Sequence, residues 1–501
     1  MRKLLLRLSK IADDLPQGTV ALSDENRDVT YSALITEVKK RMEWLKDIET
    51  HVLAIQSGNS VEWVLIDLAC QALDVVVVPL PEFFSSEQVS RCVSVSGVDT
   101  IISDKPICPM GSDESFQSVA YCTHVSLNSN YFAWKSILAT QPEIPVGTQK
   151  ITFTSGSTGS PKGVCLSREH QWRVAESLAT VVSLKRPVHL CVLPLGTLLE
   201  NVAGVYAPLL CGGRVVVVAE QQRGMIGSSR VDANALLSCI SEIQPDSIIL
   251  VPQLLLLLVN ACETGWSPPS SLKFIAVGGG RVAISLITKA RESGLPIYQG
   301  YGLSECGSVV SLNTFEQDQV QAAGKILPHC QIKIVDGEIV VSGASFLGYL
   351  GQKESWYPEE VKTGDIGSVN EGFLTINGRR KNLLVSSYGR NIHPEWVESN
   401  LLSNPFIRWC VVAGEAKPYL TAIISASKDV SNTIIQYWID TCNQSLPDYA
   451  RVRGWLRVDD CYSPKYLTAN GRVKREEILA DFVESLEKLY AESNTEQIGI
   501  N

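Results

Sequence analysis

The sequence predicts an α/β fold with a smaller mixed domain at its C-terminal end. Up to about residue 320, apolar runs of strand length alternate with segments of helical period, which is typical of parallel βαβ units. Beyond Gly324, short alternating runs lie between Gly and Asp turns and indicate an antiparallel β subdomain. From Lys381 onward, strands and helices mix again over a length that suits a small domain.

Length supports the same division, because 501 residues are too many for one hydrophobic core. We therefore expect an N-terminal domain over residues 1–380 and a C-terminal domain over residues 381–501. The expected strands are residues 51–56, 75–79, 100–103, 188–194, 214–219, 247–251, 274–277, 297–298, 331–335, 338–342, 372–376, 409–414 and 420–424. The expected helices are residues 29–46, 59–72, 86–93, 169–182, a segment ending at 207–211, 234–243, 433–442 and 474–491, and residues 104–147 are expected to form an irregular connection.

Composition narrows the class of protein. Hydrophobic residues make up 45% and charged residues 19%, as in a well-packed globule, and the net charge of −9 argues against a nucleic-acid partner. The 14 cysteines show no CxxC spacing, which favours reduced thiols in a cytoplasmic protein. The basic, apolar start is expected to form an amphipathic helix, and the longest apolar run, around residues 250–259, is too short for a transmembrane segment.

The segment from Ile151 to Val164 runs from a short apolar strand into a Gly/Ser/Thr-rich loop. Its glycines allow backbone N–H groups to face an anion, and Lys162 adds a positive charge. It is not a Walker A loop, because no Gly-Lys-Ser/Thr run opens a helix. A triphosphate-binding loop and a flexible surface loop both fit this composition. The residues that would contact phosphate are Thr154, Ser155, Gly156, Ser157, Thr158, Gly159 and Lys162.

Four further stretches carry groups that suit a nucleotide site. In residues 300–305 an aromatic ring could stack on a base, and a carboxylate could bind Mg²⁺. In residues 363–367 a short acid lies in a glycine turn and suits ribose hydroxyls. Residues 378–382 form a basic cluster, and residues 467–475 form a turn before a basic helix start. Taken singly, each stretch also has an ordinary explanation: residues 300–305 and 363–367 as turns, residues 378–382 as a solvated basic face, and residues 467–475 as a helix cap.

The order of these motifs, together with Gly278–Gly280, resembles that of the core motifs of the adenylate-forming superfamily. That family includes acyl-CoA synthetases, luciferases and peptide-synthetase adenylation domains, and the likeness runs from Thr30 to the 467–475 turn. The resemblance implies a large N-terminal domain of two α/β sheets and a β subdomain, followed by a small mobile α+β domain. It also implies ATP and Mg²⁺ as cofactors, and a second half-reaction in which the acyl group passes to a thiol.

The resemblance assigns roles to individual residues. Thr154–Lys162 would bind the ATP phosphates, and Thr154 with Glu305 would bind Mg²⁺. Gly278, Gly279, Gly280 and Tyr301 would frame the adenine, and Gly302 and Ser304 would also bind the nucleotide. Asp365 would bind the ribose hydroxyls, with Arg379 nearby. Lys381 would lie at the hinge, and Gly389 would line the thiol channel.

Residues 193–200 resemble the acyl-binding segment of long-chain fatty acyl-CoA synthetases, with Thr197, Leu199 and Glu200 at pocket positions. The segment has no Asp to pair with an amino group, so the substrate is expected to be a plain carboxylic acid, fatty or otherwise apolar. A purely structural role for this Leu-rich segment stays open. The acceptor is expected to be CoA or the phosphopantetheine of an acyl or peptidyl carrier protein. Alternatives are a biosynthetic enzyme for an aromatic or unusual acid, and a catalytically weak nucleotide-binding homologue.

The final turn departs from the family pattern. Relatives have Gly-Lys there, with the lysine bridging the acyl carboxylate and ATP, whereas this chain has Arg472. Arginine keeps the charge but presents a planar fork, so the exchange is not conservative. Lys474 lies two residues further on and is the other candidate for the catalytic cation.

Overall fold

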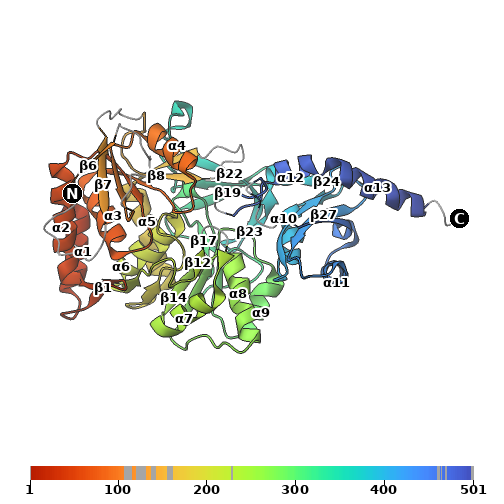
Figure 1. Ribbon diagram of the computed structural model, residues 1–501, viewed down its shortest axis with the longest axis horizontal. Helices are drawn as coiled ribbons and strands as arrows, with labels where there is room; N and C mark the ends of the chain where they lie inside the picture. Colours follow the sequence, from red (N-terminus) through yellow and green to blue (C-terminus); the bar gives the residue numbers. More distant parts are fainter. Residues whose placement is uncertain are drawn as a thin grey trace.

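The computed structural model describes residues 2–105, 116–119, 131–136, 143–154, 162–226, 230–459, 463, 465–468 and 471–497. The N-terminal part of the chain, red to green in Figure 1, contains two large sheets with their helices. The C-terminal part, in blue, forms a smaller lobe at one end of the molecule. This is the α/β architecture with a smaller C-terminal domain that the sequence predicts.

The first sheet has eight strands, and its centre is the parallel set β4, β3 and β5. These strands consist mainly of buried β-branched side chains, as expected for a sheet covered on both faces. In spatial order the strands are β21 (Gly348–Tyr349), β9 (Lys162–Ser167), β8 (Thr148–Thr154), β4 (Val76–Pro79), β3 (Val52–Gln56), β5 (Thr100–Ser103), β7 (Phe132–Ser136) and β6 (Phe116–Val119). Strands β6 and β7 fall in residues 104–147, so the expectation of a wholly irregular connection there was wrong.

The second sheet has thirteen strands and changes character along its width. From β1 to β16 all neighbouring pairs are parallel except the edge hairpin β1–β2, whereas from β16 to β19 they are antiparallel. The order is β19 (Gln331–Val335), β20 (Glu338–Ser342), β22 (Glu360–Asn370), β23 (Phe373–Arg379), β18 (Lys325–Ile326), β17 (Ser311–Leu312), β16 (Ile297–Tyr301), β15 (Phe274–Val277), β14 (Ser247–Leu250), β10 (Val188–Leu190), β11 (Arg214–Val216), β1 (Val20–Ser23) and β2 (Asp28–Thr30). The predicted antiparallel β subdomain therefore continues this sheet, because β16 pairs directly with β17.

Helices join the two sheets through a shared core. The largest cluster of buried side chains combines β3 and β4 of the first sheet, β1 and β11 of the second, and residues of α3 and α5. Helix α3 begins at a serine cap, since Ser60 Oγ accepts a hydrogen bond from the Trp63 N–H. The helices of this part are α1 (Arg2–Asp13), α2 (Tyr31–Asp47), α3 (Val61–Leu73), α4 (Ser86–Ser96), α5 (Arg168–Val182), α6 (Ala207–Leu210), α7 (Ala233–Ile243), α8 (Pro252–Glu263) and α9 (Ile284–Glu292).

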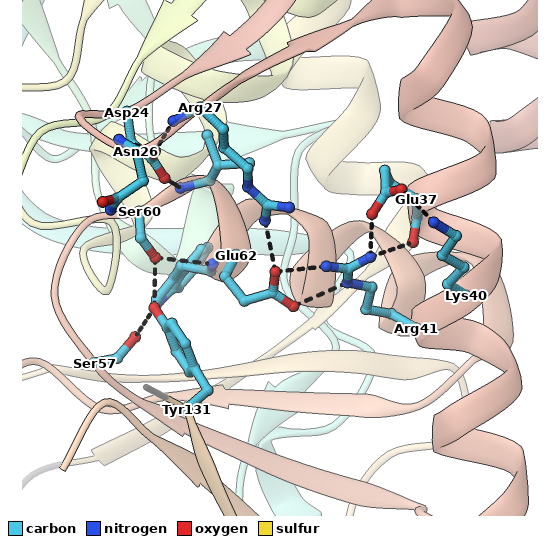
Figure 2. Close-up of polar contacts among 12 residues, drawn as sticks. Asp24, Asn26, Arg27, Glu37, Lys40, Arg41, Ser57, Ser60, Glu62 and Tyr131 are labelled. Carbon is cyan, nitrogen blue, oxygen red and sulfur yellow. Dashed lines mark hydrogen bonds and ion pairs between the residues drawn. The ribbon is translucent and has the colours of Figure 1, made fainter. Parts of the chain in front are cut away.

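A buried ion cluster holds α2 against α3 (Figure 2). The Arg41 guanidinium donates from Nε to Glu62 Oε1 at 2.9 Å and from Nη2 to Glu62 Oε2 at 2.7 Å. Arg27 donates to Glu62 Oε2 as well, at 2.7 Å. The Arg41 and Glu62 side chains are 0% and 1% exposed, so this pair is fully removed from water.

The C-terminal lobe contains a three-stranded sheet in the order β26–β27–β28, with its own core. Residues 474–491 were expected to form one helix, but two helices meet at Phe482, whose backbone leaves the helical region. The elements of this lobe are β24 (Leu384–Val385), β25 (Asn391–Ile392), α10 (Pro394–Leu401), β26 (Ile407–Ala413), β27 (Leu420–Ala426), α11 (Asn432–Gln444), β28 (Val452–Val458), α12 (Arg475–Asp481) and α13 (Val483–Gln497). In the described part of the chain, every helix is too short or too polar to span a bilayer.

Candidate active site

The two ends of the glycine-rich loop lie side by side. Thr154, the last residue of β8, is the cross-strand partner of Lys162, the first residue of β9. The residues between them, including Ser155, Gly156, Ser157, Thr158 and Gly159, lie outside the described part of the structure. The Lys162 ammonium nitrogen lies 5.2 Å from the ring centroid of Tyr349, within the range of a cation–π contact.

The predicted metal ligand Glu305 lies in a short 3₁₀ helix, Ser304–Cys306, that follows β16. Tyr349 Oη donates a hydrogen bond to Glu305 Oε1 at 2.9 Å. Burial, and then the negative charge of Glu305, raise the pKa of the Tyr349 phenol, which stays protonated at neutral pH. Sequence reasoning missed Tyr349, because the tyrosine lies 44 residues from its carboxylate partner and no local pattern marks it.

Gly302 is required by the tight turn that carries Glu305. A Cβ atom at Gly302 would lie 1.6 Å from the Ser308 carbonyl oxygen, so no other residue fits there. Ser308 has a φ of 114°, which is unusual for a residue with a side chain and marks local strain. Of the other predicted adenine-site residues, Gly278, Gly279 and Gly280 directly follow the end of β15, at the carboxyl edge of the parallel strands.

Asp365 and Arg379 are brought together as cross-strand partners on β22 and β23. Arg379 Nε lies 2.9 Å from Asp365 Oδ1, and Tyr301 Oη donates to Asp365 Oδ2 at 2.6 Å. Burial raises the pKa of Asp365, while the Arg379 charge and the Tyr301 hydrogen bond oppose that rise. The three residues form one polar unit, and the Tyr301 hydroxyl fixes its ring beside the acid. Its stacking on adenine stays a prediction.

Arg472 reaches this site from the C-terminal lobe. Arg472 is exposed, and partial desolvation by the surrounding protein and then the positive charge of Arg379 lower its pKa, while the negative charge of Glu305 opposes that change. The guanidinium therefore lies within electrostatic range of both Glu305 and Arg379. Lys474 instead pairs with Glu477 on α12, at 3.3 Å. Which of the two residues is the cation of the ATP site stays a prediction.

The predicted hinge and channel residues lie between the two lobes and on the smaller lobe. Lys381 Nζ is 3.7 Å from Glu476 Oε1, and both side chains are exposed. Gly389 occupies a turn with a φ of 71°, and its N–H donates to the Ser386 carbonyl. Their roles in domain rotation and thiol access stay predictions.

The three predicted acyl-pocket residues have different surroundings. Thr197 Oγ1 donates to the Pro194 carbonyl at 2.7 Å, and Leu199 packs against two of the hydrophobic clusters of the large domain. Glu200 is 0% exposed and accepts from the Leu193 N–H at 3.0 Å, so it belongs to a closed polar network of the core. It also begins a π-helix, Glu200–Tyr206, where an α-helix was expected to approach residues 207–211.

A group with metal-ligand chemistry lies in the same network. His189, Cys191 and Glu200 offer ligand atoms within 4.8 Å of one another, and all three are buried. However, His189 Nε2 already lies 3.0 Å from Glu200 Oε1, and His189 Nδ1 lies 2.9 Å from Ser247 Oγ. The buried Arg223 guanidinium also interacts electrostatically with Cys191 and Glu200. A nearby positive charge disfavours the binding of a divalent cation. We therefore interpret the three residues as part of a hydrogen-bonded network in the core.

The site thus combines a lysine and a carboxylate that both contact Tyr349 with an aspartate held by Tyr301 and Arg379. The profile of the AMP-binding enzyme family matches residues 8–350, and the profile of its C-terminal domain matches residues 381–494. The chain belongs to the AMP-binding enzyme family. The predicted class of AMP-forming acyl-CoA ligase is thereby confirmed, whereas the domain boundary at residues 380 and 381 stays a prediction.

Curated relatives include two kinds of ligase. The 2-succinylbenzoate–CoA ligase of Bacillus subtilis is 28% identical, over 79% of this chain and 82% of that protein. Its counterpart from Bacillus pumilus is 31% identical, and the match covers 53% of this chain and 56% of that protein. A long-chain-fatty-acid–CoA ligase of Mycobacterium bovis is 26% identical, over 79% of this chain and 78% of that protein.

Solved structures agree with these assignments. The o-succinylbenzoate CoA synthetase of Bacillus subtilis with its acyl-adenylate intermediate has a TM-score of 0.75 and 25% identity, covering 94% of this chain and 97% of that chain. The same synthetase has been solved with ATP and a magnesium ion, the cofactors predicted here. An anthranilate CoA ligase, with a TM-score of 0.76, 18% identity and coverage of 95% and 96%, supports the fold alone.

Proposed function

We propose that this protein is an ATP-dependent acid–thiol ligase. A carboxylate oxygen of the substrate attacks the α-phosphorus of ATP, the bond to the β-phosphate bridging oxygen breaks, and pyrophosphate leaves. The thiol sulfur then attacks the acyl carbonyl carbon, and AMP leaves with the electrons of the acyl–oxygen bond. The observation that carries the proposal is that Lys162 and Glu305, the predicted phosphate-binding lysine and Mg²⁺-binding carboxylate, lie together because both contact Tyr349.

The chain's own groups suit the first half-reaction. Two anions must meet, so the positive charges of Lys162 and Arg472 would offset their repulsion. Asp365, fixed by Tyr301 and Arg379, presents a buried carboxylate suited to ribose hydroxyls. Glu305 and Thr154 offer hard oxygen donors of the kind that Mg²⁺ prefers, and Glu305 is already oriented by a hydrogen bond. Mg²⁺ held there would neutralise phosphate charge.

For the acid, we favour an aromatic carboxylic acid over a fatty acid. Support comes from the curated relatives, among which 2-succinylbenzoate–CoA ligases recur, with a fatty-acid ligase also present. For the acceptor we favour CoA over a carrier protein, because these curated relatives are CoA ligases. A cytoplasmic location fits the described cysteines, which are free thiols.

The test is acid-dependent ATP–pyrophosphate exchange across aromatic, fatty and amino acids, followed by product analysis with CoA and with a carrier protein. We expect exchange with at least one aromatic acid, lost in Lys162→Ala and Glu305→Ala. Lys353→Ala, which changes an exposed lysine of a surface ion pair, is the matched control. Binding of ATP without exchange for any acid would overturn the ligase assignment and favour a catalytically weak nucleotide-binding homologue, the function that Arg472 in place of lysine also suggests.

A further inference from the structure

Residues 346–350, which we call the strap, connect the Glu305 segment with the strand that begins at Lys162. The Phe346 N–H donates to the Glu305 carbonyl at 2.8 Å. Further along, the Leu347 N–H donates to the Cys165 carbonyl and the Leu350 N–H to the Gly163 carbonyl, both at 2.8 Å. The strap is therefore hydrogen-bonded to both of the backbone segments that carry the predicted catalytic groups.

Tyr349, in the middle of the strap, contacts both catalytic side chains at once. Its hydroxyl donates to Glu305 Oε1, and its ring lies under the Lys162 ammonium. Within the part of the chain that the structure describes, Tyr349 is the sole hydrogen-bond donor to the Glu305 carboxylate. A hydrogen bond to one carboxylate oxygen fixes the rotation of the carboxylate and directs the other oxygen elsewhere.

Tyr349 is itself held rigidly. Its N–H donates to Ser355 Oγ at 2.8 Å, and its carbonyl accepts from Trp356 Nε1 at 3.1 Å. The Phe346 ring packs edge-on against the tyrosine ring at 4.8 Å between centroids. The preceding Gly348 has no room for a side chain, since a Cβ there would lie 2.6 Å from Trp356 Cδ1. A side chain whose backbone and ring are both held by neighbours in this way is suited to orienting other groups.

We propose that Tyr349 is a positioning residue of the ATP site. Its phenol directs Glu305 toward the Mg²⁺ of the nucleotide, and its ring places the Lys162 ammonium beside the same phosphates. One rigid side chain thus sets the relative positions of the metal-binding carboxylate and the phosphate-binding lysine. The proposal rests on the proposed function, because it takes Glu305 and Lys162 as nucleotide-binding groups.

The test is ATP binding measured by calorimetry in the absence of any acid, at a series of Mg²⁺ concentrations and in EDTA. Tyr349→Phe removes the hydroxyl and keeps the ring. We expect the Mg²⁺ concentration for half-maximal enhancement of ATP binding to rise about tenfold, the range seen when second-layer partners of metal ligands are lost. ATP binding in EDTA should stay within about twofold of the native value, since the ring under Lys162 remains.

Tyr349→Leu removes the ring as well, and it should weaken ATP binding in EDTA in addition to the Mg²⁺ effect. Tyr357→Phe is the matched control, because its hydroxyl accepts a hydrogen bond from the Val146 N–H at 2.6 Å, outside this site. It should leave both measurements unchanged.

Two results overturn the proposal. Either Tyr349→Phe leaves the Mg²⁺ dependence unchanged, or it weakens ATP binding equally with Mg²⁺ and with EDTA while lowering the melting temperature, which a merely structural residue would do. Glu305→Gln in the same titration separates the two levels of inference. If Glu305→Gln shifts the Mg²⁺ dependence and Tyr349→Phe does not, only the role of Tyr349 fails. If neither variant shifts it, the role of Glu305 in the proposed function fails too.

Discussion

The ion cluster between α2 and α3 and the candidate active site use the same kinds of residue in opposite ways. In the cluster, Arg41 and Glu62 are buried and bonded to each other through two hydrogen bonds (Figure 2). In the site, Lys162 is exposed and Glu305 is half-buried, and a single tyrosine holds both from one side. Charged groups that stabilise the fold are saturated by protein partners, whereas charged groups that bind a ligand are oriented but kept available.

The largest effect on stability should come from breaking the closed cluster. Arg41→Met leaves the Glu62 carboxylate buried without its main partner, so the free energy of unfolding should fall by about 3–5 kcal/mol. Urea denaturation measures this, and pyrophosphate exchange per folded molecule should be unchanged. Lys40→Met, on the same helix in a half-exposed pair with Glu37, should cost about 1 kcal/mol or less. Equal losses of unfolding free energy in the two variants would contradict the view that the buried pair stabilises the fold more than the exposed one.

A substitution in the candidate active site should have the opposite effect, lowering activity while leaving stability nearly unchanged. Glu305→Gln should lower acid-dependent pyrophosphate exchange by about 10²-fold, because a neutral amide is a poorer ligand for Mg²⁺. The melting temperature should barely change, since the carboxylate is not part of a closed network. Glu354→Gln, on an exposed 3₁₀ turn, is the control for a surface acid. A large loss of stability in Glu305→Gln would show that Glu305 is a structural residue like Glu62.

Substitution of Arg472, the candidate cation on the small lobe, should have the next largest effect on activity. Arg472→Ala should reduce the rate of adenylate formation by about 10- to 100-fold in a single-turnover assay, because one charge facing the phosphates is lost. Arg472→Lys should recover part of that rate, since the charge is kept on a different stem. Lys474→Ala should change the rate less than about twofold, as its pair with Glu477 is partly exposed. The reverse ranking would make Lys474 the catalytic cation.

The same contrast shows what the sequence could reveal. The order of strands and helices follows from local periodicity, and the motifs around Asp365 and Arg379 marked both as candidates, which the structure brings together. Tyr349 was not, because its function arises only when β21 pairs with β9 and brings it to Glu305. Long-range strand pairing of this kind leaves no local pattern.

The contacts of Glu200 are long-range in the same way. The resemblance of its segment to fatty acyl-CoA synthetases suggested a pocket position and left a structural role open, and its carboxylate lies 3.0 Å from His189 on β10, eleven residues earlier. Gly204 permits that contact, because a Cβ there would lie 2.2 Å from Glu200 Oε1. The continuity of the second sheet was missed as well, since the link between β16 and β17 is two residue pairs long and follows an irregular turn.

A smaller, pH-dependent effect should arise where a buried histidine supports the Glu305 turn. His170 is 4% exposed, and its Nε2 would lie 2.7 Å from a Cβ at Gly307, two residues after Glu305. Burial, and then the charges of His329 and Arg173, lower the pKa of His170 from 6.5 to about 4. Below pH 6.5 the unfolded chain therefore takes up a proton that the folded protein refuses until about pH 4.

Stability should consequently fall as the pH drops from 6.5 toward 4, and His170 should account for about 2 kcal/mol of that fall at pH 5. Urea denaturation of the wild type and of His170→Gln at pH 7.5 and pH 5 isolates this share, since the variant lacks the titrating imidazole and should lose correspondingly less. His51→Gln is the control for replacing a histidine on the surface, because the His51 side chain is 77% exposed. If His170→Gln lost as much stability as the wild type on acidification, the imidazole behind Glu305 would have to be protonated in the folded protein, and the turn would carry a buried positive charge beside the metal-binding carboxylate.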